Sequence, residues 1–110
     1  MTVIQIKIVN YRDNTGQTIL HIVVDAMNVS ALGALVELGL AGSFINTVDK
    51  FNMTPMHIAA INFDYEIFGI LKTLNADMSI KDSEGKTPID YLKENDDINE
   101  DIINEIINQH

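Results

Sequence analysis

The chain has 110 residues, of which 46% are apolar, no cysteine, and a formal net charge of −9. This length predicts a single domain, the lack of cysteine excludes disulfides and thiolate chemistry, and the negative charge argues against a nucleic-acid partner because phosphates would be repelled. No apolar run reaches the roughly 18 residues of a membrane span and no secretion signal is visible, so we expect an intracellular protein without a membrane partner.

Residues 2–9 have the alternation of a β-strand. Ile4, Ile6 and Ile8 fall on one side of the segment, and a period of two is the strand pattern. No second strand is evident elsewhere in the chain, so the edge of this one would be open to another chain. The segment therefore raises the hypothesis of a homodimer through residues 2–9, in which the strands of two copies pair.

A nine-residue phrase that begins at Asp13 occurs three times. Asp13-Asn14-Thr15-Gly16-Gln17-Thr18-Ile19-Leu20-His21 returns in related form as residues 49–57 and again as residues 82–90. Thr18 and Thr54 are 36 residues apart, and Thr54 and Thr87 are 33 apart. A fixed period of this size indicates stacked repeats. We therefore divide the domain into an N-terminal strand or cap (1–12), repeat 1 (13–48), repeat 2 (49–81) and repeat 3 with the C-terminal cap (82–110).

Each phrase predicts a turn followed by a helix. The turn needs a residue that tolerates positive φ, the helix needs an N-cap, and proline suits the first helical turn. The turn residues are Gly16, Asn52 and Gly85; the caps are Thr54 and Thr87, with Thr18 at the same place in repeat 1; the prolines are Pro55 and Pro88.

Second helices are predicted after the first ones. In repeat 2 the apolar residues of this helix lie between Tyr65 and Leu74, and in repeat 3 residues 97–109 place isoleucines at helical spacing opposite acids and asparagines. Repeat 1 is three residues longer than repeat 2, and we assign the surplus to Gly39-Leu40-Ala41.

These phrases resemble the ankyrin repeat. Thr54-Pro55-Met56-His57-Ile58-Ala59-Ala60 is similar to that family's Thr-Pro-Leu-His segment, and Asn75-Ala76-Asp77-Met78-Ser79 to its closing Gly-Ala-Asp segment. The resemblance covers about residues 9 to 95. It implies an all-α solenoid of two full repeats with atypical caps, and a non-catalytic protein–protein interaction module. Ile19 stands where the family has proline, and Asp90 where it has histidine.

Few residues invite a catalytic or metal-binding interpretation. His21 and His57 could be bases or ligands, but the resemblance implies structural roles for both, together with Thr18, Thr54, Thr87, Gly16 and Gly85. The acids at 96, 97, 100 and 101 lack the glycine and ligand spacing of a calcium loop, and acids favour a helix start. No phosphate loop or nucleophile motif occurs, so we expect no enzyme, cofactor or metal.

The resemblance also places the partner-binding face on the turn tips and on the solvent side of each first helix. In repeat 1 this face presents Arg12, Asn14, Thr15, Gln17, Asp25 and Ala26; in repeat 2 it presents Val48, Lys50, Phe51, Met53, Ile61 and Asn62; and in repeat 3 it includes Lys81. The residues of repeat 2 are more apolar than those of its neighbours, which is typical of an interaction site. Either they form an exposed patch, or Phe51 or Ile61 folds over the adjacent helix or covers the gap left by the longer repeat 1.

Three functions follow from these patterns. The first is recognition of another protein, with Arg12, Val48, Lys50, Phe51, Met53, Ile61, Asn62 and Lys81 as the candidate contacts. The second is homo-oligomeric assembly through the N-terminal strand. The third is a regulatory subunit or inhibitor that blocks an enzyme.

Overall fold

The computed structural model describes residues 2–108, which form eight helices and no strand. This confirms the all-α class. Residues 1, 109 and 110, and with them the ends of the predicted cap and of the predicted C-terminal helix and the terminal His110, lie outside the described residues. The helices are α1 (Val3–Asn10), α2 (Ile19–Asp25), α3 (Val29–Glu37), α4 (Ala41–Phe44), α5 (Pro55–Ile61), α6 (Tyr65–Thr73), α7 (Pro88–Leu92) and α8 (Glu100–Asn108).

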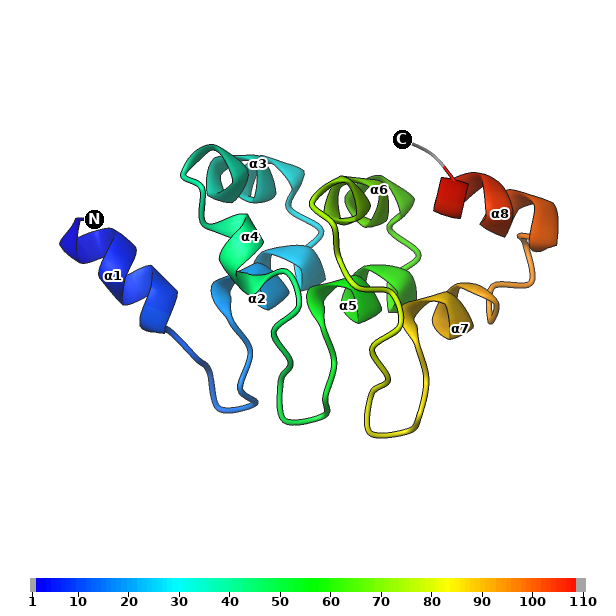
Figure 1. Ribbon diagram of the computed structural model, residues 1–110, viewed down its shortest axis with the longest axis horizontal. Helices are drawn as coiled ribbons and strands as arrows, with labels where there is room; N and C mark the ends of the chain where they lie inside the picture. Colours follow the sequence, from blue (N-terminus) through cyan, green and yellow to red (C-terminus); the bar gives the residue numbers. More distant parts are fainter. Residues whose placement is uncertain (1, 109–110) are drawn as a thin grey trace.

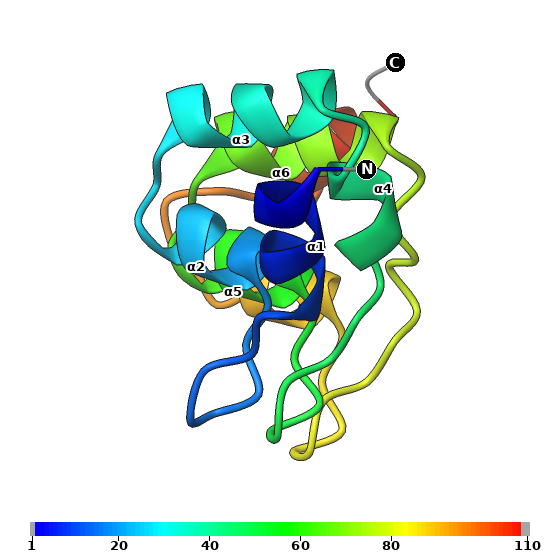
Figure 2. The same ribbon diagram turned by 90° about the vertical axis from the view of Figure 1, so that its left-hand side faces the viewer.

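Three helix pairs lie side by side along the long axis of the molecule (Figure 1). The pairs are α2 with α3, α5 with α6, and α7 with α8, and the loops before α2, α5 and α7 all project in the same direction. The central helix α5 packs against α2, α6 and α7. Because α2, α5 and α7 form one row, the three loop tips and the starts of these helices share one side of the molecule (Figure 2).

The start of each first helix is set by a threonine. The hydroxyls of Thr18, Thr54 and Thr87 accept a hydrogen bond from the backbone three residues further on, which satisfies a donor left free at the helix end. Pro55 and Pro88 occupy the first helical turn, where no hydrogen-bond donor is required. The predicted N-caps are confirmed.

Each projecting turn is closed around an aspartate and a residue with positive φ. Gly16 and Gly85 both have φ of 79°, and Asn52 has φ of 59°, as predicted. At Gly16 a side chain would also lack room, because a Cβ there would come within 3.2 Å of the Lys50 backbone nitrogen. The glycine thus permits both the turn and its close approach to the next one.

The strand predicted for residues 2–9 is wrong, because residues 3–10 form helix α1. The hydroxyl of Thr2 accepts from the Gln5 backbone while the Gln5 side chain accepts from Thr2, so a capping box starts the helix. A helix satisfies its own backbone groups, whereas a strand would need a partner that the described chain does not offer. The pairing of two strands therefore no longer supports a homodimer.

The three surplus residues of repeat 1 lie between the end of α3 and Asp49, where the chain forms the short helix α4. This agrees with the predicted position. The predicted C-terminal helix begins later than expected, at Glu100 and not at residue 97. The acids of its first turn are accordingly Glu100 and Asp101, while Asp96 and Asp97 precede it.

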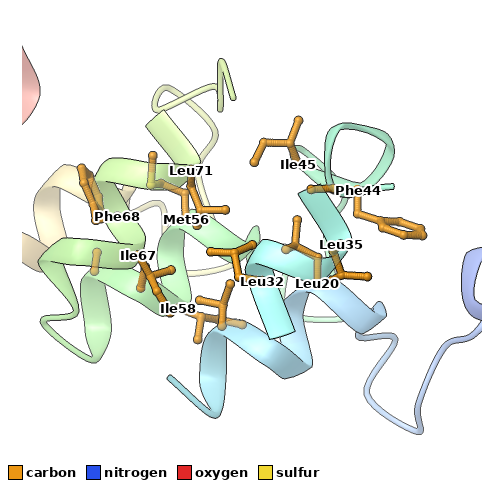
Figure 3. Packing of buried hydrophobic residues seen from close by; sticks show 14 of the residues in the cluster. Leu20, Leu32, Leu35, Phe44, Ile45, Met56, Ile58, Ile67, Phe68 and Leu71 are labelled. Atoms are coloured by element: carbon orange, nitrogen blue, oxygen red, sulfur yellow. The ribbon is translucent and has the colours of Figure 1, made fainter. Parts of the chain in front are cut away.

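The core runs along the molecule between the two rows of helices (Figure 3). Leu20 and Leu32 come from the first pair, and Met56, Phe68 and Leu71 from the second, and all five are fully buried. Each such side chain contributes about 1.5–3 kcal/mol by leaving water. This shared core holds the turns and the first helices in register.

Candidate interaction surface

A groove of about 630 Å³ opens between repeats 1 and 2, and we call it the α2–α5 groove. Repeat 1 contributes its turn and the end of α2, through Asp13, Thr15, Gln17 and Asp25. Repeat 2 contributes its turn and one side of α5, through Asp49, Phe51, Met53, Ile58, Ile61 and Asn62. The groove thus combines an apolar side from repeat 2 with polar and acidic groups.

The structure brings together four of the eight predicted contact residues. Phe51, Met53, Ile61 and Asn62 all line the α2–α5 groove. The others do not line it. Lys50 lies at the adjoining turn tip, with its ammonium group 5.2 Å from the centre of the Phe51 ring, whereas Arg12, Val48 and Lys81 are exposed elsewhere.

The apolar residues of the groove remain accessible to solvent. Phe51 is 49% exposed and Ile61 is 39% exposed, so neither is covered by the adjacent helix. Met53 is half-buried beneath them and packs against the core. Large apolar side chains that cluster in a hollow and are rimmed by polar groups are typical of a protein-binding site.

Two buried histidines hold the turns in place. Nδ1 of His21 accepts from the Thr18 backbone, and its Nε2–H donates to the Met53 carbonyl of the next repeat at 2.8 Å. His57 repeats the arrangement, with the Thr54 backbone as donor and the Lys86 carbonyl as acceptor at 2.9 Å. Both ring nitrogens of each histidine are therefore occupied, which leaves none for a metal or a proton transfer.

Burial also keeps His21 neutral. Removal from water lowers the pKa of His21 from its ordinary value of 6.5, and this outweighs the hydrogen bond to the Met53 carbonyl and the nearby charge of Asp49, which raise it. A neutral imidazole is the form that can accept at one nitrogen and donate at the other.

Neighbouring turns are also joined directly. The Lys50 backbone nitrogen donates to the Thr15 carbonyl at 2.9 Å, and the Ser83 backbone nitrogen and hydroxyl both donate to the Phe51 carbonyl. Phe51 therefore presents its side chain from a backbone that is bonded to the next turn. Such a support pre-organises the apolar side of the groove.

The aspartate of each turn is the centre of its hydrogen bonds. Oδ1 of Asp49 accepts from the backbones of Phe51 and Met53, and Oδ1 of Asp82 accepts from those of Glu84 and Lys86. In repeat 3 there is a further bond, from the Tyr91 hydroxyl to Oδ2 of Asp82.

This additional bond changes the acidity of both groups. Burial would raise the pKa of Asp82, but the hydrogen bond from Tyr91 and those from the turn backbone more than offset it, and the pKa is lowered. Burial, together with the adjacent carboxylate, raises the pKa of Tyr91. The phenol therefore stays protonated and continues to donate.

Sequence reasoning missed three residues of the α2–α5 groove, namely Asp13, Asp49 and Ile58. The aspartates were treated only as parts of the repeated phrase. Ile58 appeared only within the repeated segment, although it stands at the position that Tyr91 occupies in repeat 3, and this difference was the available signal.

A second hollow, of about 480 Å³, lies between α1 and α2. Its lining is mainly apolar and consists of Ile4, Ile8, Ile19 and Ile22 together with Lys7 and Tyr11. Figure 2 shows α1 across this end of the molecule. None of the residues of α1 is fully buried, so this helix covers the end of the core only in part.

No protein-family model matches the chain, and no curated protein matches it. None of the described helices is long and apolar enough to cross a membrane. Within residues 2–108, no group of three or more His, Cys, Asp or Glu side chains is arranged to hold a metal ion, and this includes the acids at the start of α8.

Proposed function

We propose that this chain is an ankyrin-type repeat domain without catalytic activity, and that it binds another protein in the α2–α5 groove. The observation that carries the proposal is the half-exposed pair Phe51 and Ile61, which line a hollow of about 630 Å³, Phe51 from a turn bonded to the next turn and Ile61 from the end of α5. A repeat stack presents its turns and first helices as a continuous surface, and binding is the function such a surface serves.

The structure favours recognition over chemistry for a second reason. The two internal histidines have both ring nitrogens engaged, and the turn aspartates are occupied with backbone donors. These groups build the framework that positions the groove. What remains accessible is an apolar surface with an acidic rim, which can contact a partner.

The test is a double variant, Phe51→Ala with Ile61→Ser. Truncating two anchors at the centre of an interface costs about 2 kcal/mol or more, so we expect affinity for a partner isolated with the parent chain to fall by at least about thirtyfold. Binding is measured by calorimetry with the purified partner, and folding by thermal melting.

The matched control is Phe63→Ala with Leu38→Ser. It removes one exposed aromatic and one exposed aliphatic residue outside the groove, at 41% and 50% exposure. We expect this control to bind as the parent does. Unchanged affinity in the groove variant, with its melting temperature preserved, would refute the proposal.

A further inference from the structure

Repeats 2 and 3 differ at one aligned position beside the turn aspartate. Ile58 of α5 corresponds to Tyr91 of α7, since both stand four residues after the capping threonine. The Tyr91 hydroxyl donates to Oδ2 of Asp82. Ile58 has no donor to offer, and within the described residues no group donates a hydrogen bond to Oδ2 of Asp49.

Asp49 is nevertheless almost enclosed. Its residue is only 6% exposed, and its carboxylate is one of the groups that line the α2–α5 groove. Among the described residues no buried side-chain oxygen or nitrogen is left without a hydrogen-bond partner, so Oδ2 of Asp49, which has no donor there, still opens onto the groove. A charged group so placed is strongly stabilised by a donor of opposite charge.

The hollow beside Asp49 is also larger than the hollow beside Asp82. The hollow next to Asp82 measures about 140 Å³, and that next to Asp49 about 630 Å³. Tyr91 is only 7% exposed and lies edge-on to His57, with ring centres 6.1 Å apart. At the equivalent place in repeat 2 the smaller Ile58 is as deeply buried, at 6% exposed, and lines the wider groove.

The charged residues that line the groove are of one sign. Asp13 and Asp25 line it together with Asp49, and no described lysine, arginine or histidine is part of the lining. The Lys50 ammonium group belongs to the adjoining turn tip and lies over the ring of Phe51. The groove therefore combines acidic groups, a deeply placed hydrogen-bond acceptor in the carboxylate of Asp49, and an apolar side.

We propose that the α2–α5 groove receives an arginine side chain from an extended segment of the partner protein, with an apolar neighbour of that arginine against Phe51 and Ile61. The guanidinium group takes the place that a tyrosine hydroxyl has in repeat 3 and donates to Oδ2 of Asp49. Its planar fork has further donors for a second carboxylate of the rim, which a single ammonium point charge would not present in fixed geometry. This inference rests on the proposed function.

The probe is a capped pentapeptide with one arginine between two leucines, compared with its citrulline twin, which keeps the shape and three N–H donors but has a carbonyl oxygen in place of one NH2 group and carries no charge. Binding is followed by NMR titration of the backbone amides of Asp49, Phe51 and Met53. We expect the arginine peptide to bind at least about tenfold more tightly, because a hydrogen bond to a charged group exceeds a neutral one by that order.

Two variants locate the effect. Asp49→Asn keeps an oxygen for the turn backbone and removes the charge, and we expect it to bring the ratio of the two affinities close to one. Asp101→Asn removes the same charge from the exposed face of α8 and should leave the ratio as in the parent. An arginine preference that persists in Asp49→Asn would overturn the inference.

A third variant, Ile58→Tyr, copies repeat 3 into repeat 2. The new hydroxyl can bond to Asp49 and the ring can pack edge-on to His21, so we expect an intact fold and loss of binding of the arginine peptide. Undiminished binding would overturn the inference. Equal affinities of the parent for both peptides would also overturn it, while leaving the groove as an apolar binding site. If neither peptide shifts the three amides at millimolar concentration, the inference falls, while the proposed function is decided separately by partner binding of the double variant Phe51→Ala with Ile61→Ser.

Discussion

Each internal histidine links two repeats through one ring. His21 and His57 accept from the backbone of their own capping threonine and donate to a carbonyl of the next turn. Asp90 occupies the same position in repeat 3, where its carboxylate accepts from the Thr87 backbone and lies exposed. The hydrogen bond from the capping threonine is therefore present in all three repeats. The bond to the carbonyl of the next turn is present only in repeats 1 and 2, each of which is followed by another described turn.

This difference predicts unequal costs for two equivalent substitutions. His57→Ala leaves the Lys86 carbonyl and the Thr54 backbone without their partner in a buried place, which should lower the free energy of unfolding by about 1–3 kcal/mol. Asp90→Ala removes only an exposed bond within its own helix start and should cost clearly less. Urea unfolding of both variants measures the difference, and equal losses would contradict the linking role of His57.

Much at the residue scale could be predicted from the sequence because it is local. A threonine before a helix, a proline in its first turn and a glycine in a tight turn each act within four residues. Oδ2 of Asp49 could not be assigned in this way. Whether this oxygen receives a hydrogen bond depends on Ile58, nine residues away. Only the comparison with Asp82 and Tyr91 reveals that no described residue donates to it.

At the scale of elements, α1 shows where pattern reasoning failed. The alternation of Ile4, Ile6 and Ile8 fits a strand, but a strand is stable only if a partner satisfies its edge. The described chain offers no such partner, and the capping box of Thr2 with Gln5 starts a helix instead. The capping signal and the alternating pattern both extend over only a few residues. The sequence alone therefore could not decide between a helix and a strand.

The packing of α1 and α5 predicts very different local stabilities. No residue of α1 is fully buried, whereas six of the seven residues of α5 are. Amides in elements with few buried contacts exchange through local opening, and those of the core only through global unfolding. Native-state hydrogen exchange should therefore show the amides of α1 exchanging much faster than those of α5. Similar protection in both helices would mean that α1 is an integral part of the core.

At the scale of the whole molecule, the stack could be predicted and the groove could not. The spacing of Thr18, Thr54 and Thr87 indicated repeated units with turns on a common side, and the structure has three helix pairs in this arrangement. The hollow arises only where the turn of repeat 1 and the start of α5 meet, and residues far apart in the chain line it together. Its volume follows from the packing between units, which no single repeat contains.

The charge of the whole chain predicts opposite effects of salt on folding and on binding. Residues 75–110 carry ten acidic and three basic residues, so the folded chain holds like charges close together. The surface ion pairs that salt would weaken, such as Lys86 with Glu94, are exposed to solvent and contribute little to stability. Screening of the repulsion should prevail, and the free energy of unfolding in urea should rise between about 0.02 M and about 0.5 M NaCl.

Binding of the arginine peptide should weaken over the same range, because salt screens its attraction to the acidic groove. The double variant Asp96→Asn with Asp97→Asn serves as the control, since it reduces the repulsion near α8 and leaves the groove intact. We expect it to show a smaller gain in stability with salt and the same loss of peptide affinity as the parent. A parent that loses stability as salt is added would show that attractive pairs, and not the excess of acids, dominate the electrostatics of the fold.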